Sequence, residues 1–237
     1  MDKVTVLAVE RAVDTMHGAL AEPLTVDDLA RSALFSKFHF CRLFRRTTGL
    51  SPARYLSALR LEEAKRLLRA TSLSVTDISH LVGYSSVGTF STRFHHSVGV
   101  SPSSYRQGQV PPAEPGAVRG APPVVTGRVI GPRAVEPVLV GLFRNPIMEG
   151  APVRLTALDH IGPYTLDKVP PGTWHVLVHA GGGDQDVFVG EHGPIEVRAG
   201  ITAHVADVVL RRRGKTDPPV LSALLDAPAP AAASQAS

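Results

Sequence analysis

Leu24-Thr25-Val26-Asp27-Asp28-Leu29 and Leu73-Ser74-Val75-Thr76-Asp77-Ile78 are two copies of one pattern, 49 residues apart. The pattern continues at an offset of 50 residues. Six further pairs share it: Phe40 and Phe90, Phe44 and Phe94, Gly49 and Gly99, Ser51 and Ser101, Pro52 and Pro102, Tyr55 and Tyr105. The second copy has one extra residue near Gly83, a change that a turn between helices tolerates. The repeat predicts two copies of one structural unit in the first half of the chain.

Each copy is predicted to form a short helix, a turn and a second helix. In the first copy, Thr25 is a suitable N-cap for a helix that ends near Ala33. Ser36 is the corresponding N-cap for a helix that runs to Thr48, where Gly49 ends it. The two copies therefore indicate two helix-turn-helix units.

A longer helix is expected between the copies. Ser51 is its N-cap and Pro52 lies in its first turn, and it runs to about Ala70. At 1.5 Å per residue such a helix is a stiff spacer roughly 27 Å long. The residues expected to face inward are apolar: Tyr55, Leu56, Leu59, Ala64, Leu67 and Leu68. In the preceding helix, Phe40, Leu43 and Phe44 have the spacing of a buried stripe.

The positive charge of the chain is concentrated in the first half. Residues 1–110 carry 14 Lys and Arg against 9 Asp and Glu, whereas residues 111–237 carry 11 against 12. No acidic side chain lies between Asp28 and Glu62, and seven basic residues lie there: Arg31, Lys37, Arg42, Arg45, Arg46, Arg54 and Arg60. Such a stretch favours a polyanion as partner, with a solvated basic face as the alternative.

The second half of the chain has a different texture. A linker rich in Pro and Gly is expected over residues 108–123, after a helical domain over residues 1–107. Short β-branched runs then predict strands over 124–130, 138–143, 153–158, 164–169, 173–180, 186–189, 195–198 and 203–210. These runs indicate an all-β sandwich domain over 124–213, and the Ala- and Pro-rich residues 214–237 indicate a disordered tail. The fold class is thus multidomain α + β, with an all-α double helix-turn-helix domain followed by a separate all-β domain.

The first half resembles the AraC/XylS family of bacterial regulators. The resemblance lies in two stretches that match the two units of that family: Asp28-Leu29-Ala30 with residues 36–46 and Gly49, and Asp77-Ile78 with 82–86, Phe90, Arg93-Phe94, 99–102 and Tyr105-Arg106. It covers about 100 of the 237 residues. It implies sequence-specific binding of double-stranded DNA and regulation of transcription, with two recognition helices in successive major grooves. Many family members carry a sensory domain before the DNA-binding region, whereas here the β-rich half follows it.

By position, the resemblance assigns base contacts to the second helix of each unit. In the first unit these residues are Phe38, Cys41 and Arg42, and the Arg42 guanidinium is suited to a bidentate contact with guanine. In the second unit they are Val87, Ser91 and Thr92. The expected phosphate contacts are basic: Lys37, Arg45, Arg46, Arg93 and His95. Because Thr92 stands where the family often has an arginine, we expect weaker base reading by the second unit, aided by a thymine methyl contact from Val87 or by DNA shape.

The second half offers no catalytic motif. Residues 162–166 and 169–176 resemble, over one turn and its flanking strands, a β-sandwich of the transthyretin-like or carboxypeptidase-regulatory type. Trp174, Val176 and Val178 are expected to face the core of that domain. His175 and His179 are about 13 Å apart along a strand, too far to share one metal ion. We therefore expect no enzyme activity, no metal site and no cofactor.

Two other functions stay open as alternatives. The first is a β-sandwich enzyme or ligand-binding module that the helical domain tethers to DNA, motivated by five histidines: His160, His175, His179, His192 and His204. The second is an architectural DNA binder without sequence preference. RNA polymerase and a small-molecule effector on the β domain are further candidate partners.

The remaining expectations concern location and redox state. The single cysteine, Cys41, excludes an internal disulfide and suits a reducing compartment. No apolar run reaches the roughly 18 residues of a membrane span, so we expect a cytoplasmic protein without a membrane partner. The oligomeric state is left open.

Overall fold

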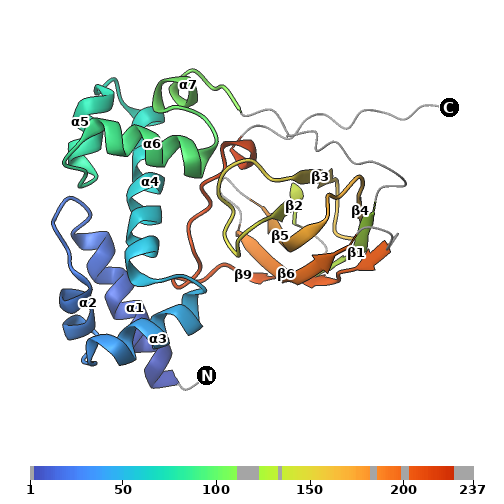
Figure 1. The fold of residues 1–237 in the computed structure, drawn as a ribbon, viewed down its shortest axis with the longest axis horizontal. Coiled ribbons are helices and arrows are strands. Elements are labelled where there is room, and N and C mark those ends of the chain that lie inside the picture. The colour runs from blue at the N-terminus through green and yellow to red at the C-terminus, as the bar shows by residue number, and fades with distance from the viewer. Residues whose placement is uncertain (1–2, 111–122, 133–134, 182–185, 199–202, 227–237) are drawn as a thin grey trace. The chain divides into compact units, whose positions relative to one another are not determined.

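The computed structural model describes residues 3–110, 123–132, 135–181, 186–198 and 203–226. The chain forms two compact units. Unit 1 consists of Met1–Gln109 together with Gly214–Leu221, and unit 2 of Val110–Arg213 together with Ser222–Ser237. Figure 1 shows helices in unit 1 and strands in unit 2. Residues 111–122 of the expected linker and 227–237 of the expected tail lie outside the described residues, whereas residues 214–221 of that tail belong to unit 1.

Unit 1 contains seven described helices: α1 (Lys3–Gly18), α2 (Val26–Ser32), α3 (Lys37–Thr48), α4 (Pro52–Ala70), α5 (Val75–Leu81), α6 (Val87–Val98) and α7 (Pro102–Arg106). Helix α1 was not among the expected elements, although its buried residues 8, 9, 12, 13 and 16 have helical spacing. None of the described helices combines the length and apolar character that a membrane crossing requires.

The repeat appears in unit 1 as two matching aromatic clusters. In the first, the ring centroids of Phe40 and Phe44 are 5.4 Å apart, and Tyr55 meets Phe44 edge-on at 5.3 Å. In the second, Phe90 and Phe94 are 5.6 Å apart, and Tyr105 meets Phe94 edge-on at 5.6 Å. Edge-to-face pairs at these distances stabilise beyond the apolar area that they bury. Both copies therefore use the same three aromatic positions as their core.

The ends of the helices are fixed by local hydrogen bonds. Thr25 and Ser74 each form a capping box, with Asp28 and Asp77 respectively as the third helical residue. The side-chain bonds from Thr25 hold the pKa of the Asp28 carboxyl at about 2, below its usual value. Ser36 lies at the N-cap position of α3 but makes no side-chain capping bond.

Helix α4 follows the predicted boundaries. It runs from Pro52 to Ala70, and its buried side chains include five of the six that the sequence placed inward. Leu67, the sixth, is half-buried. Lys65 is buried although a charged residue was not expected there, and its exposed fraction is 6%.

Unit 2 contains two β-sheets. Its strands are β1 (Val124–Ile130), β2 (Val138–Phe143), β3 (Arg154–Leu158), β4 (Pro163–Leu166), β5 (Gly172–Ala180), β6 (Phe188–Val197), β7 (Ala203–Val205), β8 (Val208–Val209) and β9 (Arg211–Arg212). One sheet has the order β4-β1-β7, with β8 also paired to β1, and the other has the order β3-β2-β5-β6-β9. Residues 186–189 and 195–198, expected as two strands, contribute instead to the single strand β6, and the expected strand 203–210 is divided among β7 and β8.

Side chains from both sheets form one hydrophobic cluster. Trp174, Val176 and Val178 of β5 are buried in it, as the alternation along this strand predicted. The Trp174 indole donates a hydrogen bond to the carbonyl of Pro170 at 2.9 Å, and the Arg144 guanidinium lies over its ring. Gly127 permits close packing beside Tyr164, because a Cβ there would lie 2.2 Å from the Ala206 carbonyl oxygen. All the buried residues of this cluster belong to unit 2.

Candidate nucleic-acid interface

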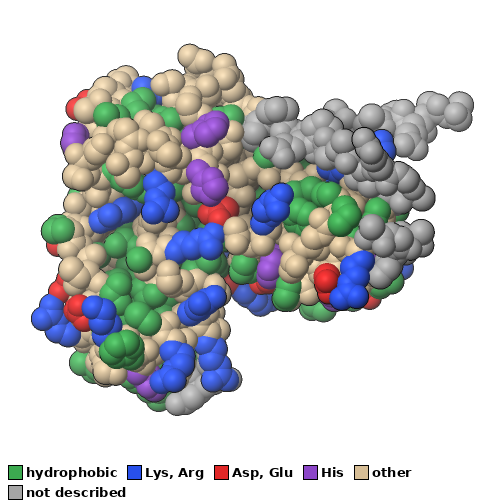
Figure 2. Space-filling view, viewed as in Figure 1, with side chains coloured by type: hydrophobic (Ala, Val, Ile, Leu, Met, Phe, Trp, Pro, Cys, Tyr) green, Lys and Arg blue, Asp and Glu red, His purple; other side chains and the backbone are tan. Residues whose placement is uncertain are grey.

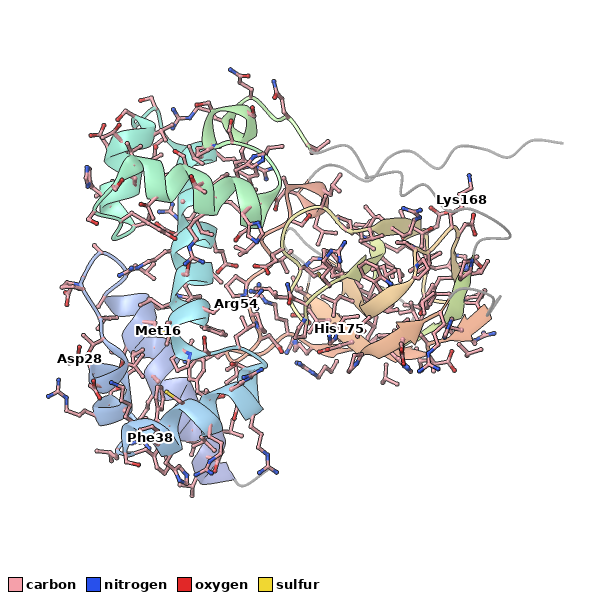
Figure 3. The ribbon with its side chains drawn as sticks, in the orientation of Figure 1. Met16, Asp28, Phe38, Arg54, Lys168 and His175 are labelled. Atoms are coloured by element: carbon pink, nitrogen blue, oxygen red, sulfur yellow. The ribbon has the colours of Figure 1, made fainter. Side chains whose placement is uncertain are left out.

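Helix α3 separates an apolar face from a face that is open to solvent. Phe40 and Phe44 are fully buried, whereas Phe38 is 87% exposed, which is the largest exposed fraction among the large hydrophobic side chains that the structure describes. Phe38 lies in the first turn of α3, at the outer surface of unit 1 (Figure 3). The ring adds little stability to the folded chain at this position, and it is open to contact by a ligand.

The cations expected on α3 share the exposed face with Phe38. Arg42 follows Phe38 by four residues and Arg45 by seven, so the three side chains lie along one side of the helix. Arg42, Arg45 and Arg46 are exposed, and none of the three has an ion pair or hydrogen bond within the described part of the chain. Cys41 is half-buried beside them. These residues can present guanidinium groups to a ligand without first breaking an internal bond.

Lys37 differs from the other predicted phosphate contacts. Its ammonium donates a hydrogen bond to Asp27 at 2.8 Å, and the two side chains are about half exposed. The bond to this carboxylate raises the pKa of Lys37. A phosphate would therefore have to compete with Asp27 for the same cation.

Helix α6 presents a smaller and less charged surface. Val87 is 39% exposed and Thr92 is exposed, while Ser91 is half-buried. Arg93 and His95 are also exposed. The view of Figure 2 shows Lys and Arg over the lower part of unit 1, and histidines over its upper part and at its lower end. The exposed faces of α3 and α6 thus differ in charge and in the size of their side chains.

Arg60, which belongs to the basic run before Glu62, and Arg106 have a structural role that the sequence did not reveal. The Arg60 guanidinium donates to the carbonyls of Leu20 and Glu22 at 2.9 and 2.7 Å, and burial lowers its pKa. The Arg106 guanidinium donates to the carbonyls of Leu68 and Leu73 at 3.3 and 2.6 Å. Each side chain holds the loop that precedes a helix-turn-helix unit. Charge counting alone could not separate these arginines from the exposed ones.

The histidines of unit 2 do not form a metal site among the described residues, where no group of three His, Cys, Asp or Glu side chains could hold an ion. His175 pairs with Glu191 at 2.9 Å, and the ring of His192 meets the Asp207 carbonyl at 2.8 Å. His160 lines an open hollow of about 490 Å³ beside Arg128 and Ile130. His175 and His192 thus make separate local contacts, and the buried Nε2 of His204 has no hydrogen-bond partner among the described residues.

The comparison with known proteins agrees with this geometry. The model of a family described as a helix-turn-helix domain matches residues 29–108. The transcriptional activator AarP of Providencia stuartii is 35% identical over 91 residues, which are 38% of this chain and 67% of that protein. The lactose operon transcription activator of Staphylococcus xylosus is 36% identical over 98 residues, which are 41% of this chain and 35% of that protein.

A solved structure of a regulator with an AraC-type DNA-binding domain, from Chromobacterium violaceum, is 31% identical, with a TM-score of 0.43. The match covers 48% of this chain and all of that one. The chain spans only about a quarter to two fifths of the length of several curated relatives that it matches. The family match lies in unit 1.

Proposed function

Since the chain belongs to the AraC family of helix-turn-helix transcriptional regulators, we propose that unit 1 binds double-stranded DNA sequence-specifically and thereby regulates transcription. Helices α3 and α6 enter successive major grooves, with α4 as the spacer between them. Base contacts come from Phe38, Cys41 and Arg42 on α3 and from Val87, Ser91 and Thr92 on α6. Phosphate contacts come from Lys37, Arg45, Arg46, Arg93 and His95.

One observation carries the proposal, namely the exposed row on α3. Phe38 and Arg42 stand one helical turn apart, and the opposite face of the helix is anchored by Phe40 and Phe44. A guanidinium can bond O6 and N7 of guanine at once, and a ring can pack on a thymine methyl group. The helix therefore offers one polar and one apolar reading group at neighbouring base pairs.

Fluorescence anisotropy across a salt series tests the proposal. A duplex is first selected by the full chain from a random pool, and a scrambled duplex serves as reference. Arg42→Ala should weaken binding to the selected duplex by about 1 to 3 kcal/mol and leave binding to the scrambled duplex nearly unchanged. Loss of a phosphate contact, as in Arg46→Ala, should instead weaken both duplexes and reduce the salt slope by about one.

The matched control removes an arginine from unit 2. Arg198 is exposed and paired with Glu196, so Arg198→Ala deletes the same charge away from α3. It should leave both affinities unchanged. Equal binding of the selected and scrambled duplexes by the unmodified chain, with one common salt slope, would show an architectural DNA binder without sequence preference.

The role of unit 2 is proposed separately from DNA binding. We infer that its two sheets form a β-sandwich of the transthyretin-like type, which serves as a sensor, a dimerisation unit or a contact for RNA polymerase. The hollow beside Arg128 and His160 is where a small-molecule effector would be sought first. Bacterial DNA lies in the cytoplasm, so we propose that this protein acts there. No catalytic role is assigned to either unit.

A further inference from the structure

Residues 214–221 separate from unit 2 and pack on unit 1. The chain leaves unit 2 after Arg213 and returns to it at Ser222. Within this segment the amide of Gly214 donates to the Asp217 carboxylate at 2.7 Å, and the amide of Asp217 donates to the Gly214 carbonyl at 3.1 Å. The segment thus begins with a tight turn in which Gly214 and Asp217 each donate a hydrogen bond to the other.

The segment is held on α4 through its backbone. The Tyr55 hydroxyl lies 2.9 Å from the carbonyl of Lys215 and 2.9 Å from that of Asp217. Ten residues further along α4, the Lys65 ammonium donates to the Val220 carbonyl at 2.9 Å. The two anchors are about 15 Å apart along the helix axis. Pro219 and Leu221 are buried, so apolar contact accompanies the hydrogen bonds.

Both anchors also contact the cores of the helix-turn-helix units. The ring of Tyr55 meets Phe44 edge-on in the first unit. The Lys65 ammonium lies 5.8 Å from the centroid of the Tyr105 ring, which meets Phe94 in the second unit. The segment therefore lies along the part of α4 that joins the two helix-turn-helix units. A further bond ties Lys215 to Asp14 of α1 at 2.9 Å.

We propose that residues 214–221 are a docking strap that splints α4 and so fixes the spacing of the two recognition helices. The consequence for DNA rests on the proposed function. Release of the strap would remove hydrogen bonds and apolar contact from α4 between the two helix-turn-helix units, which lowers the free-energy cost of local opening there. A DNA site that spans two grooves needs both recognition helices in place. Because both ends of the strap continue into unit 2, any event there that displaces the strap would alter DNA binding.

Tyr55→Phe and Lys65→Met in the full chain test the strap. Each variant removes the bond to the strap and keeps most of the side-chain volume. Tyr84→Phe is the matched control, since its hydroxyl bonds Ser57 and not the strap. Trypsin cleavage after Lys215 reports release of the strap, because cleavage follows the population of the open form. We expect Tyr55→Phe to raise the cleavage rate about fivefold and Lys65→Met about tenfold, with no change for the control.

Two further readouts report the splint. Hydrogen exchange of the α4 amides over residues 58–66 should rise with strap release, without DNA present. Preference for the selected duplex over one with its second half-site scrambled should fall about threefold in both variants. Unchanged cleavage would overturn the docking, and faster cleavage with unchanged α4 exchange would overturn the splint. A wild-type chain that selects no duplex would instead refute the proposed function, while cleavage and exchange would still decide on the strap.

Discussion

Leu34 adopts a backbone conformation that suits glycine, and Leu34→Gly should stabilise unit 1. The residue lies in the turn between α2 and α3 and has a φ of +62°. The corresponding turn of the second copy contains Gly83, with a φ of +83°. Nothing in the environment of Leu34 rewards the larger side chain, because it is 78% exposed.

The expected gain follows from two opposing terms. A left-handed conformation costs a residue with a Cβ about 1 to 2 kcal/mol. Glycine loses more chain entropy on folding, which offsets about 0.5 to 1 kcal/mol of that gain. The loss of burial is small for so exposed a side chain. The net effect should be an increase of about 0.5 to 1 kcal/mol in the free energy of unfolding, or a few degrees in Tm.

Two spectroscopic signals separate the units in a urea titration. Trp174 is the only tryptophan and is buried in unit 2, so its fluorescence follows that unit. Circular dichroism at 222 nm follows the helices, which the structure describes mainly in unit 1. Leu34→Gly should move the dichroism midpoint to higher urea and leave the fluorescence midpoint in place.

Gly83→Ala is the opposite control. Its Cβ would lie 2.3 Å from the Leu20 carbonyl oxygen and 2.9 Å from Cζ of Arg60, a side chain that its own hydrogen bonds hold in place. This variant should lower the dichroism midpoint. A midpoint for Leu34→Gly that is unchanged or lowered would refute the reasoning from backbone strain.

Three other predictions concern the cap, the core and the interface. The pKa of Asp28 is depressed to about 2, so the stability that this carboxylate adds is present above pH 4 and is lost as the pH falls toward 2. Thr25→Ala should therefore shift the midpoint of acid unfolding of unit 1 to a higher pH. Phe94→Ala should cost about 3 to 5 kcal/mol in the helical transition and leave the tryptophan transition unchanged, which chemical denaturation would show. Replacing the thymine nearest Phe38 by deoxyuridine should lower the affinity of the wild-type chain for the selected duplex, as measured by anisotropy, and should have little effect on the affinity of Phe38→Ala. Equal losses of affinity in both proteins would exclude the methyl contact.

The sequence alone determined the features of unit 1 that depend on neighbouring residues. The capping boxes at Thr25 and Ser74 and the glycine ends of α3 and α6 follow from groups three or four residues apart. The repeat located both aromatic cores, because the same spacing recurs in each copy. The exposed face of α3 followed from the same period, by exclusion of its buried stripe.

Only the tertiary structure decided features that join distant parts of the chain. Lys65 is buried because its ammonium reaches a carbonyl 155 residues away, and Tyr55 meets the strap 160 residues away. The same holds for Arg60, whose guanidinium bonds a loop 40 residues earlier in the chain and so is not part of the exposed basic surface. No local pattern encodes such pairs, since each residue also fits a solvated helix face. Their partners become known only when the chain has folded and brought the two segments together.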